Sequence, residues 1–543
     1  NGDDVGFDTL GGNDTISIVA GTIAGGVEGG GGDDEFALSG GTVSGSVSGN
    51  IGNDTIELAG TTVTGFLSGG QDDDQITILS GSATNVSGNI GNDTIAMAGG
   101  SVDTNIHGGD GDDSIGISGG TVGSNVFGSG GNDTITVSGG TIGGGVNGDD
   151  DADEISVTGT ATVNADLDGG AGNDSLGVAG GATSAGSGLG GTEDDEIDLS
   201  GGTVGVDVDA GGGDDTILLS GTAVTGEVIA SAGNDTVNLS GGSAANVFGG
   251  SGTDTIVAQG TASIAGGIFG ESDSDQIEVF GASLINRIDG GSGDDTLRLF
   301  GTNGGGSFEG ALLQDMSQGI FGGSGTDVLD LQGVIGTLPA TLEGVETMLV
   351  QNASQLDLHH PGSDTRDLGI GAESPFTLYV DGLSQINADG NSPGVVNLLG
   401  NVALEGLLTM GDLEANDLTR VTGDYAGANG SLLVIDASLD ASNVGDRLLI
   451  EGSVTDVTVP TVGLVANGTT QVSVLDVGSG FGIETGDGPG DGILVVDVSN
   501  TGNTDDDDFF LVGGPIQRGA VEYDLVLQTD GNWYLQSELL DQI

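Results

Sequence analysis

The residues best suited to chemistry in this sequence are aspartates that recur at a near-constant interval. One appears every 19 to 21 residues from Asp14 to Asp295, and a further one, Asp327, follows after 32 residues. Carboxylate oxygens are hard ligands, and with main-chain carbonyls they bind Ca²⁺ at about 2.3–2.6 Å. The sixteen candidate metal ligands are Asp14, Asp34, Asp54, Asp74, Asp93, Asp113, Asp133, Asp153, Asp174, Asp195, Asp215, Asp235, Asp254, Asp275, Asp295 and Asp327.

Each aspartate opens a repeat whose apolar residues also keep fixed offsets. After Asp133 they are Ile135, Val137, Ile142 and Val146, at +2, +4, +9 and +13. The first two alternate with period two, as in a strand with one buried face. The last two lie on either side of a position that is often Gly. We therefore expect two short strands and two Gly-rich turns per repeat.

Repeats of this size need neighbours to form a core. One repeat cannot bury its own apolar face, whereas stacked repeats can. The 114 Gly residues among 543 also oppose helix. The sequence thus predicts an all-β fold, a parallel β-solenoid (β-helix or β-roll) with about 20 residues per coil and about 4.8 Å between coils.

The charge balance makes a bare row of aspartates unfavourable. The formal net charge is −76, all six basic residues are Arg, and none precedes Arg287. Carboxylates stacked about 4.8 Å apart repel by roughly 0.9 kcal/mol in water and by about 3.5 kcal/mol at an effective dielectric constant of 20. We therefore expect several structural Ca²⁺ ions in one row along one edge. The alternative is a set of solvated acidic turns that hold no ion.

Several function classes are disfavoured. The negative charge opposes binding of nucleic acid, and zero Cys excludes disulfides and thiolate metal sites. No nucleophile-elbow, zincin or P-loop motif is present, and the N-terminal acids have no Lys or Arg nearby, so we expect no enzyme. The pair His359–His360 has no further ligand near it in sequence, and His107 stands alone, so we expect neither to bind metal.

The aspartate turns resemble the calcium motif GGxGxDxUx of RTX (repeats-in-toxin) proteins, where U is a large apolar residue. This resemblance implies that each matching Asp binds Ca²⁺ together with turn carbonyls of adjacent coils. The second turn, SGGTV at 39–43 and 200–204, carries no regular acid, unlike the usual two-sided RTX roll. The one-sided pattern is similar to the solenoid of RTX ice-binding adhesins. Full matches occupy 29–37, 108–116, 169–177, 249–257, 290–298 and 322–330.

The period breaks after about residue 300, which predicts four parts. We expect an RTX-like calcium-binding solenoid of 15 coils at 1–300, an insertion with the last RTX-like motif at 301–330, an irregular metal-free solenoid at 331–505, and a terminal β cap at 506–543.

The C-terminal part resembles the passenger domain of autotransporters, the pertactin-like type V secreted proteins. The similarity lies in 344–358, 423–454, 490–498 and 507–539, and the last stretch resembles the autochaperone cap that ends in Trp-Tyr-Leu. The matching residues of the cap are Phe510, Gly519, Tyr523, Leu525, Trp533, Tyr534 and Leu535.

The resemblance implies a place at the cell surface of a Gram-negative bacterium. It also implies a tether to the outer membrane through a barrel that would follow residue 543, and we expect the chain to be a piece of a longer protein. We expect a monomer whose partner is a host or bacterial surface receptor.

The function expected is a calcium-stabilised autotransporter passenger that serves as a surface stalk or adhesin, with calcium driving its folding after secretion. One alternative is a type I secreted RTX or surface-layer protein. A second is an ice-binding solenoid, for which Thr15, Thr55 and Thr94 form part of a row that Glu35 and Gln75 interrupt.

Overall fold

The computed structural model describes residues 7–280, 284–301, 316–358, 365–369, 376–388, 395–410, 415, 417–428, 430–439, 444–454, 457–459, 464–466, 468–476, 485, 491–499, 504, 508–518 and 521–539. All regular elements in these stretches are β-strands, and none of the described segments is a helix long and apolar enough to cross a membrane. His359, His360, Gly519 and most of the expected insertion fall outside the described residues. The chain divides into two compact units, Asn1–Gly266 and Gly267–Ile543.

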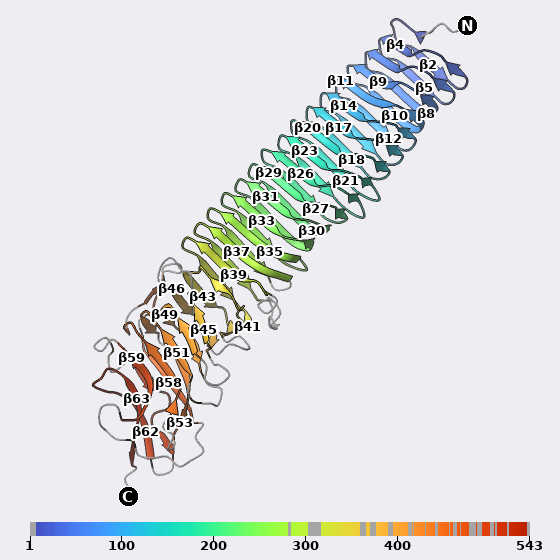
Figure 1. Ribbon diagram of the computed structural model, residues 1–543. Helices are drawn as coiled ribbons and strands as arrows, with labels where there is room; N and C mark the ends of the chain where they lie inside the picture. Colours follow the sequence, from blue (N-terminus) through green and yellow to red (C-terminus); the bar gives the residue numbers. More distant parts are fainter. Residues whose placement is uncertain are drawn as a thin grey trace. The chain divides into compact units, whose positions relative to one another are not determined.

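The first unit is a parallel β-solenoid, as predicted (Figure 1). In the coil that follows Asp133, β18 (Thr134–Val137), β19 (Thr141–Ile142) and β20 (Val146–Asp150) each pair in parallel with the equivalent strand of the next coil. Ile135, Val137, Ile142 and Val146 are fully buried, which confirms the inward offsets. The core is therefore a set of apolar rows that run from coil to coil.

Each coil holds three strand segments where the sequence predicts two. The residues at +9 and +13 stand on different strands because the chain bends between them, at Gly143–Gly145 in this coil. A Cβ on Gly144 would overlap with Oδ1 of Asn125 in the preceding coil. The Gly at +11 thus makes room for a side chain in a corner of the coil.

The strand that follows each aspartate forms the first row of the unit. In four coils this strand continues without a break through the position of the next strand of the coil. The register between β10 and its neighbour β8 is irregular. The first row comprises β2 (Thr15–Ile18), β5 (Glu35–Leu38), β8 (Thr55–Val63), β10 (Gln75–Ala83), β12 (Thr94–Met97), β15 (Ser114–Ile117), β18, β21 (Glu154–Val157), β24 (Ser175–Val178), β27 (Glu196–Leu199), β30 (Thr216–Val224), β32 (Thr236–Ala244) and β34 (Thr255–Ala258).

The second row consists of two-residue strands, and the third row leads into the next aspartate turn. The second row comprises β3 (Thr22–Ile23), β6 (Thr42–Val43), β13 (Ser101–Val102), β16 (Thr121–Val122), β19, β22 (Thr162–Val163), β25 (Thr183–Ser184) and β28 (Thr203–Val204). The third comprises β4 (Val27–Gly31), β7 (Val47–Ile51), β9 (Phe66–Gln71), β11 (Asn85–Ile90), β14 (Ile106–Asp110), β17 (Val126–Gly130), β20, β23 (Leu167–Ala171), β26 (Gly188–Thr192), β29 (Val208–Gly212), β31 (Val228–Ala232) and β33 (Val247–Ser251).

The second unit also consists of stacked parallel strands. One sheet contains β38 (Thr296–Phe300), β40 (Val328–Gln332), β43 (Thr347–Gln351), β46 (Phe376–Val380), β49 (Gly400–Leu404) and β52 (Tyr425–Gly427). A second contains β41 (Ile335–Thr337), β44 (Gln355–Asp357), β47 (Gln385–Asn387), β50 (Leu407–Thr409), β53 (Leu432–Ser438), β58 (Thr470–Asp476) and β60 (Phe509–Leu511). A third contains β45 (Thr365–Leu368), β48 (Val395–Leu398), β51 (Leu418–Val421), β55 (Arg447–Ile450), β59 (Ile493–Val498), β63 (Trp533–Leu539), β62 (Val521–Leu527) and β61 (Ile516–Arg518).

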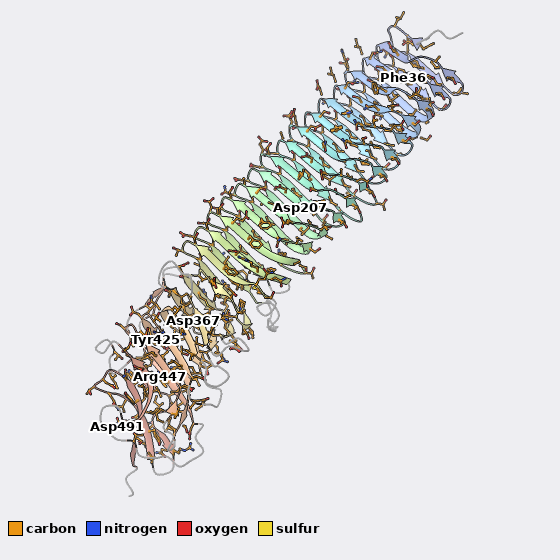
Figure 2. The ribbon with its side chains drawn as sticks, in the orientation of Figure 1. Phe36, Asp207, Asp367, Tyr425, Arg447 and Asp491 are labelled. Atoms are coloured by element: carbon orange, nitrogen blue, oxygen red, sulfur yellow. The ribbon has the colours of Figure 1, made fainter. Side chains whose placement is uncertain are left out.

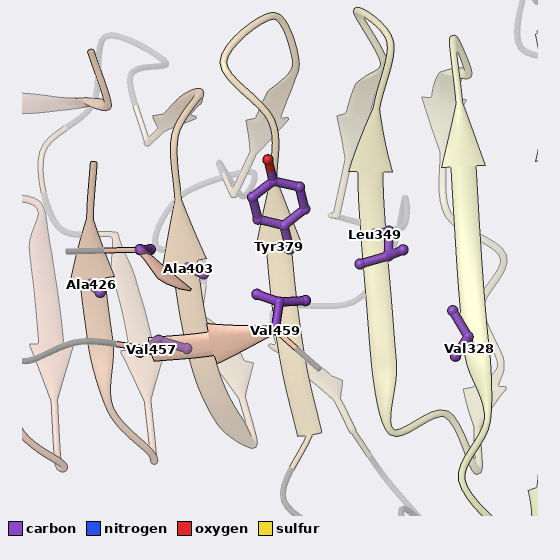
Figure 3. Close-up of a cluster of buried hydrophobic side chains, with 8 residues drawn as sticks. Val328, Leu349, Tyr379, Ala403, Ala426, Val457 and Val459 are labelled. Carbon is purple, nitrogen blue, oxygen red and sulfur yellow. The ribbon is translucent and has the colours of Figure 1, made fainter. Parts of the chain in front are cut away.

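An antiparallel hairpin covers part of the first of these sheets. Its strands β56 (Val457–Val459) and β57 (Leu464–Ala466) pair with each other. Val457 and Val459 form one buried cluster with Leu349, Tyr379 and neighbouring residues of β40 to β52 (Figure 3). This explains why every residue of β46 is buried, where a solenoid strand ordinarily exposes alternate side chains.

The C-terminal strands turn antiparallel and close with aromatic residues. β61, β62 and β63 form an antiparallel meander whose last strand pairs with β59. Phe509 lies 5.7 Å from both Tyr425 and Trp533, measured between ring centroids. Phe510, which the sequence assigns to the cap, is 47% exposed, because the neighbouring Phe509 occupies the inward position of the strand.

A substitution inside one coil tests the assignment of buried and outward faces. Ile135→Ala removes a fully buried side chain and should lower the free energy of local opening by about 2–5 kcal/mol, measured by amide hydrogen exchange in calcium. Thr136→Ala, on the outward face of the same strand, should change it by less than about 0.5 kcal/mol. Equal effects would contradict the assignment.

Candidate metal centre

The recurring aspartates form what we call the inner acid row, placed just before the first strand of each coil. Except for Asp14, all sixteen predicted ligands are buried, with exposed fractions of 0–3%. Within each unit they stand in register, so that Asp113, Asp133 and Asp153 occupy equivalent places in successive coils. The structure therefore brings the predicted residues into rows.

One carboxylate oxygen of each aspartate is used for stacking. Oδ1 of Asp113 accepts a hydrogen bond from the backbone N–H of Asp93, and Oδ1 of Asp133 accepts one from Asp113, both at 2.7 Å. The same bond repeats along the row at 2.7–2.9 Å. Each aspartate thus ties its coil to the preceding one.

The other carboxylate oxygen, Oδ2, is buried and makes no hydrogen bond. An ionised oxygen taken out of water without a partner costs several kcal/mol, and proteins ordinarily avoid it. Fourteen such oxygens in equivalent places indicate that a ligand completes them. They belong to Asp14, Asp34, Asp54, Asp74, Asp93, Asp113, Asp133, Asp153, Asp174, Asp195, Asp215, Asp235, Asp295 and Asp327.

A glycine five residues before the aspartate leaves room for this oxygen. A Cβ on Gly128 would overlap with Oδ2 of Asp133 and would lie 2.7 Å from the carbonyl oxygen of Gly148 in the next coil. A carboxylate oxygen and a main-chain carbonyl therefore approach the same glycine from two coils. Gly108 has the same surroundings, with Oδ2 of Asp113 and the carbonyl of Gly128.

The turn keeps its shape where acids replace its glycines. The residues four and two positions before each aspartate have positive φ, which glycine adopts most easily. Before Asp153 these places hold Asp149 (φ 82°) and Asp151 (φ 72°). Asp153 nevertheless accepts the same hydrogen bond, from Asp133 at 2.7 Å. The acid-rich turns are therefore equivalent to the Gly-rich turns in their backbone and in the place of their aspartate.

Burial raises the pKa of these carboxyls, and neighbouring aspartates raise it further. The pKa of Asp74 rises to about 8. For Asp113, Asp153, Asp195, Asp235 and Asp327 it rises to about 7. For Asp54, Asp93, Asp133 and Asp295 it rises to about 6, also mainly through burial. Near neutral pH, protons and a cation would therefore compete for these carboxylates.

In the first seven coils, the residue before each aspartate forms a second, exposed row of Asn and Asp side chains. Asp112 accepts the backbone N–H of Asn132 at 2.9 Å, and Asn92 accepts that of Asp112 at 3.0 Å. Asn and Asp alternate strictly over seven coils, which spaces the charges two coils apart. The members are Asn13, Asp33, Asn53, Asp73, Asn92, Asp112 and Asn132.

The bend between the second-row and third-row strands of the coil also carries oxygen side chains, which the sequence pattern did not reveal. Asn125 accepts the backbone N–H of Gly145 at 2.8 Å, and Asp207 accepts that of Glu227, also at 2.8 Å. Figure 2 labels Asp207 on its coil. Asn, Asp, Ser and Glu all occur in this bend, so no single residue type recurs there.

Glu346, which the repeat spacing does not predict, continues the inner acid row after Asp327. Its Oε2 accepts the backbone N–H of Asp327 at 2.7 Å, as Asp Oδ1 does elsewhere. Gly344 is the register equivalent of Gly322, the glycine that stands five residues before Asp327. Gly344, however, stands only two residues before Glu346. This turn is shorter by three residues, and the longer Glu side chain spans the difference. In the following coil the equivalent residue is the buried Phe376, which ends the row.

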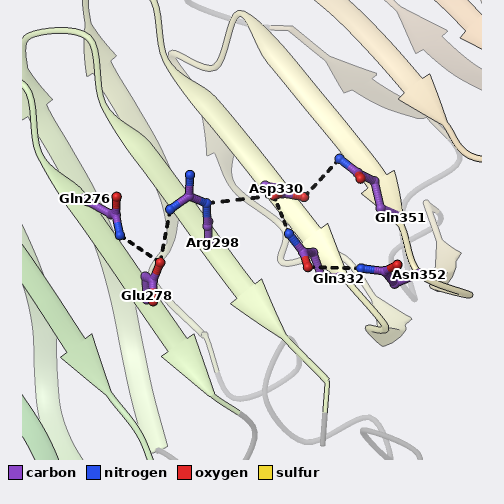
Figure 4. A network of polar contacts seen from close by, with 7 residues as sticks. All are labelled: Gln276, Glu278, Arg298, Asp330, Gln332, Gln351 and Asn352. Carbon is purple, nitrogen blue, oxygen red and sulfur yellow. Dashed lines mark hydrogen bonds and ion pairs between the residues drawn. The ribbon is translucent and has the colours of Figure 1, made fainter. Parts of the chain in front are cut away.

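Arginines neutralise acids in the second unit. Arg298 lies 3.0 Å from Glu278 and 3.9 Å from Asp330, at the centre of a polar network on neighbouring strands (Figure 4). Arg420 lies 2.6 Å from Glu451, and Arg447 lies 3.5 Å from Asp497. The first unit has no Lys or Arg for this purpose.

The donors of the inner acid row fit a hard cation held partly by the main chain. Among the described residues, no three His, Asp or Glu side chains cluster tightly enough to hold a metal by themselves. A bound ion would therefore combine an aspartate oxygen with turn carbonyls. Ca²⁺ accepts such irregular oxygen shells, whereas Mg²⁺ requires a near-ideal octahedron. The orphaned Oδ2 atoms and the neighbouring carbonyls fit the first ion better.

Comparisons with known proteins agree with the C-terminal resemblance. Residues 408–525 match the family model of autochaperone domain type 1. Over 178 residues the chain is 30% identical to the uncharacterized protein YuaQ of Escherichia coli (strain K12), a match that covers 32% of this chain and 12% of that protein. The autochaperone match and the β-solenoid support an autotransporter-like passenger.

A solved structure is also among the proteins that this chain matches. It is a hyperactive, Ca²⁺-dependent, β-helical antifreeze protein from an Antarctic bacterium, solved by X-ray crystallography. The identity is 21%, the TM-score is 0.31, and the alignment covers 59% of this chain and 83% of that one.

Two adjacent aspartates provide a matched test of the inner acid row. Asp113→Asn keeps an oxygen for the stacking hydrogen bond but removes the buried charge, so it should destabilise its coils in calcium and leave them unchanged or more stable in EDTA. Asp112→Asn, in the exposed row where Asn is common, should change neither. Hydrogen exchange of residues 94–137 measures both, and equal effects of the two variants would contradict the assignment.

The raised pKa values predict how stability depends on pH without metal. Protons bind more tightly to the folded row than to the unfolded chain, whose Asp pKa is about 3.9. In EDTA, stability is therefore fully present below about pH 4 and lost as the pH rises through 6 to 8. In calcium the ion displaces these protons, so stability should increase over the same range. Between pH 5 and pH 8, the free energy of unfolding in urea should fall in EDTA and rise in calcium. The same pH dependence under both conditions would contradict the prediction.

Proposed function

We propose that this chain is a calcium-stabilised passenger segment of an autotransporter, displayed on the surface of a Gram-negative bacterium as a stalk or adhesin. The observation that carries the proposal is the row of buried, unpartnered carboxylate oxygens in a unit without Lys or Arg. Ca²⁺ would act there as a structural ion, held by the inner acid row and by turn carbonyls. No catalytic role is proposed for these acids.

The two units would fold under different conditions. Inside the cell free calcium is scarce, and the first unit would stay open because its acids repel one another. Outside, weak calcium sites fill at about millimolar concentration. The second unit, with arginine pairs, the hairpin over β46 and the aromatic closure, needs fewer ions. We expect the second unit to fold first.

The alternatives have less support. A type I secreted RTX or surface-layer protein would share the acid row, but the autochaperone match favours the passenger. For an ice-binding surface, the outward row at the start of the first strands places Glu35 between Thr15 and Thr55, and Gln75 between Thr55 and Thr94. These longer side chains break the flat threonine array that such a surface requires.

The full chain allows the two units to be followed separately. All four Tyr and the single Trp lie in the second unit, so Trp533 fluorescence reports on that unit alone. In EDTA we expect amides of residues 7–266 to exchange rapidly while Trp533 fluorescence keeps its native spectrum. Millimolar Ca²⁺ should restore protection.

A comparison with Mg²⁺ is the control for this test. Mg²⁺ at the same concentration should restore much less protection. Full protection of residues 7–266 in EDTA would overturn the proposal.

A further inference from the structure

A shallow hollow lies on the outer face of the first unit, over the third-row strands that lead into the aspartate turns. It has a volume of about 690 Å³ and spans four coils, from β9 to β17. Four coils spaced about 4.8 Å apart give the hollow a length of roughly 14 Å along the stack. A strand of six residues gives it roughly 17 Å in the strand direction. Its lining includes Phe66, Asn85, Asn89, Ile90, His107 and Asp110.

The hollow is centred on a coil one residue shorter than its neighbours. Asp74 and Asp93 are 19 residues apart, whereas the coils on either side have 20. Asn85 pairs with Phe66 of the preceding coil, and Phe66 projects with 58% of its surface exposed. The shorter coil between longer ones explains a local recess in an otherwise regular face.

The lining combines apolar surface with uncharged polar groups. Phe66 and Ile90 stand at opposite ends of the third-row strands, and both are more than half exposed. Between them Asn89 accepts a hydrogen bond from Ser87 at 3.0 Å and donates one to Ser68 at 2.5 Å. The ring of His107 stacks on Phe127 with 4.8 Å between centroids, which holds the imidazole in place.

Three polar side chains in the lining remain available for a ligand. No side-chain hydrogen bond to another described residue is made by the amide of Asn85, the imidazole of His107 or the carboxylate of Asp110. They come from two adjacent coils. Amides and carboxylates bind vicinal hydroxyls through paired hydrogen bonds, and aromatic rings pack against the C–H faces of sugars.

We propose that this hollow binds an extended, uncharged oligosaccharide. An anionic glycan is disfavoured because no Lys or Arg lies in this unit and the chain carries −76 charges. An apolar peptide is disfavoured because Phe66 and Ile90 are separated by Ser and Asn side chains. The inference deepens the proposed surface role by naming a receptor class, and it rests on that role only for its biological meaning.

The probes are cellopentaose and chitopentaose, with a heparin-derived pentasaccharide as the anionic comparison. Binding to the full chain in calcium is followed by saturation-transfer NMR and calorimetry. At least one neutral probe should bind. Phe66→Ala should weaken its binding by about tenfold, and Asn85→Ala by about three- to tenfold.

Leu79→Ala is the matched control for these variants. Leu79 is also half exposed and lies on the same coil as Asn85, but it does not line the hollow, so its substitution should leave binding unchanged. Absence of binding by both neutral probes, equal binding of the anionic probe, or an equal loss in Leu79→Ala would overturn the proposal.

Far-UV circular dichroism of each sample separates this proposal from the proposed function. A chain that folds with calcium but binds neither neutral probe overturns the sugar site and leaves the calcium role standing. A chain that binds a probe and folds equally well in EDTA supports the sugar site and overturns the calcium role.

Discussion

The repulsion between carboxylates stacked about one strand spacing apart is the constraint on which the first unit depends. Parallel coils place equivalent residues directly above one another, so a single aspartate per repeat becomes a continuous row of charge. One oxygen of each carboxylate contributes to stacking through a backbone hydrogen bond, but the other is buried without a partner. The same geometry that joins the coils therefore creates the requirement for a counter-charge.

The chain meets this requirement differently in different places. In the exposed row from Asn13 to Asn132, alternation of Asn with Asp halves the charge density, and side chains such as Asn92 and Asp112 accept a backbone N–H of the next coil. In the second unit, arginines stand between acids of neighbouring strands. The inner acid row of the first unit has neither alternating Asn residues nor arginines to reduce its charge. A bound cation would suit its oxygen donors. Within the second unit, Glu346 and then Phe376 mark the end of the row that includes Asp327.

Much of this could be predicted from the sequence because the repeat is so regular. The aspartate spacing and the apolar offsets predict the solenoid and the inward faces, which the structure confirms at Ile135 and Val146. The third strand segment could not be predicted, because the bend at Gly143–Gly145 depends on Asn125 of another coil. Glu346 was missed because its turn is shortened and its residue type differs. The hairpin over Tyr379 was missed because its partners lie far away in the sequence.

The most direct test of the central claim is a crystal structure of the chain grown in calcium, with anomalous scattering measured at a long wavelength. We expect a row of anomalous peaks, each within about 2.6 Å of an inner-row Oδ2 atom and of turn carbonyls. Well-ordered coils with only water beside those oxygens would contradict it.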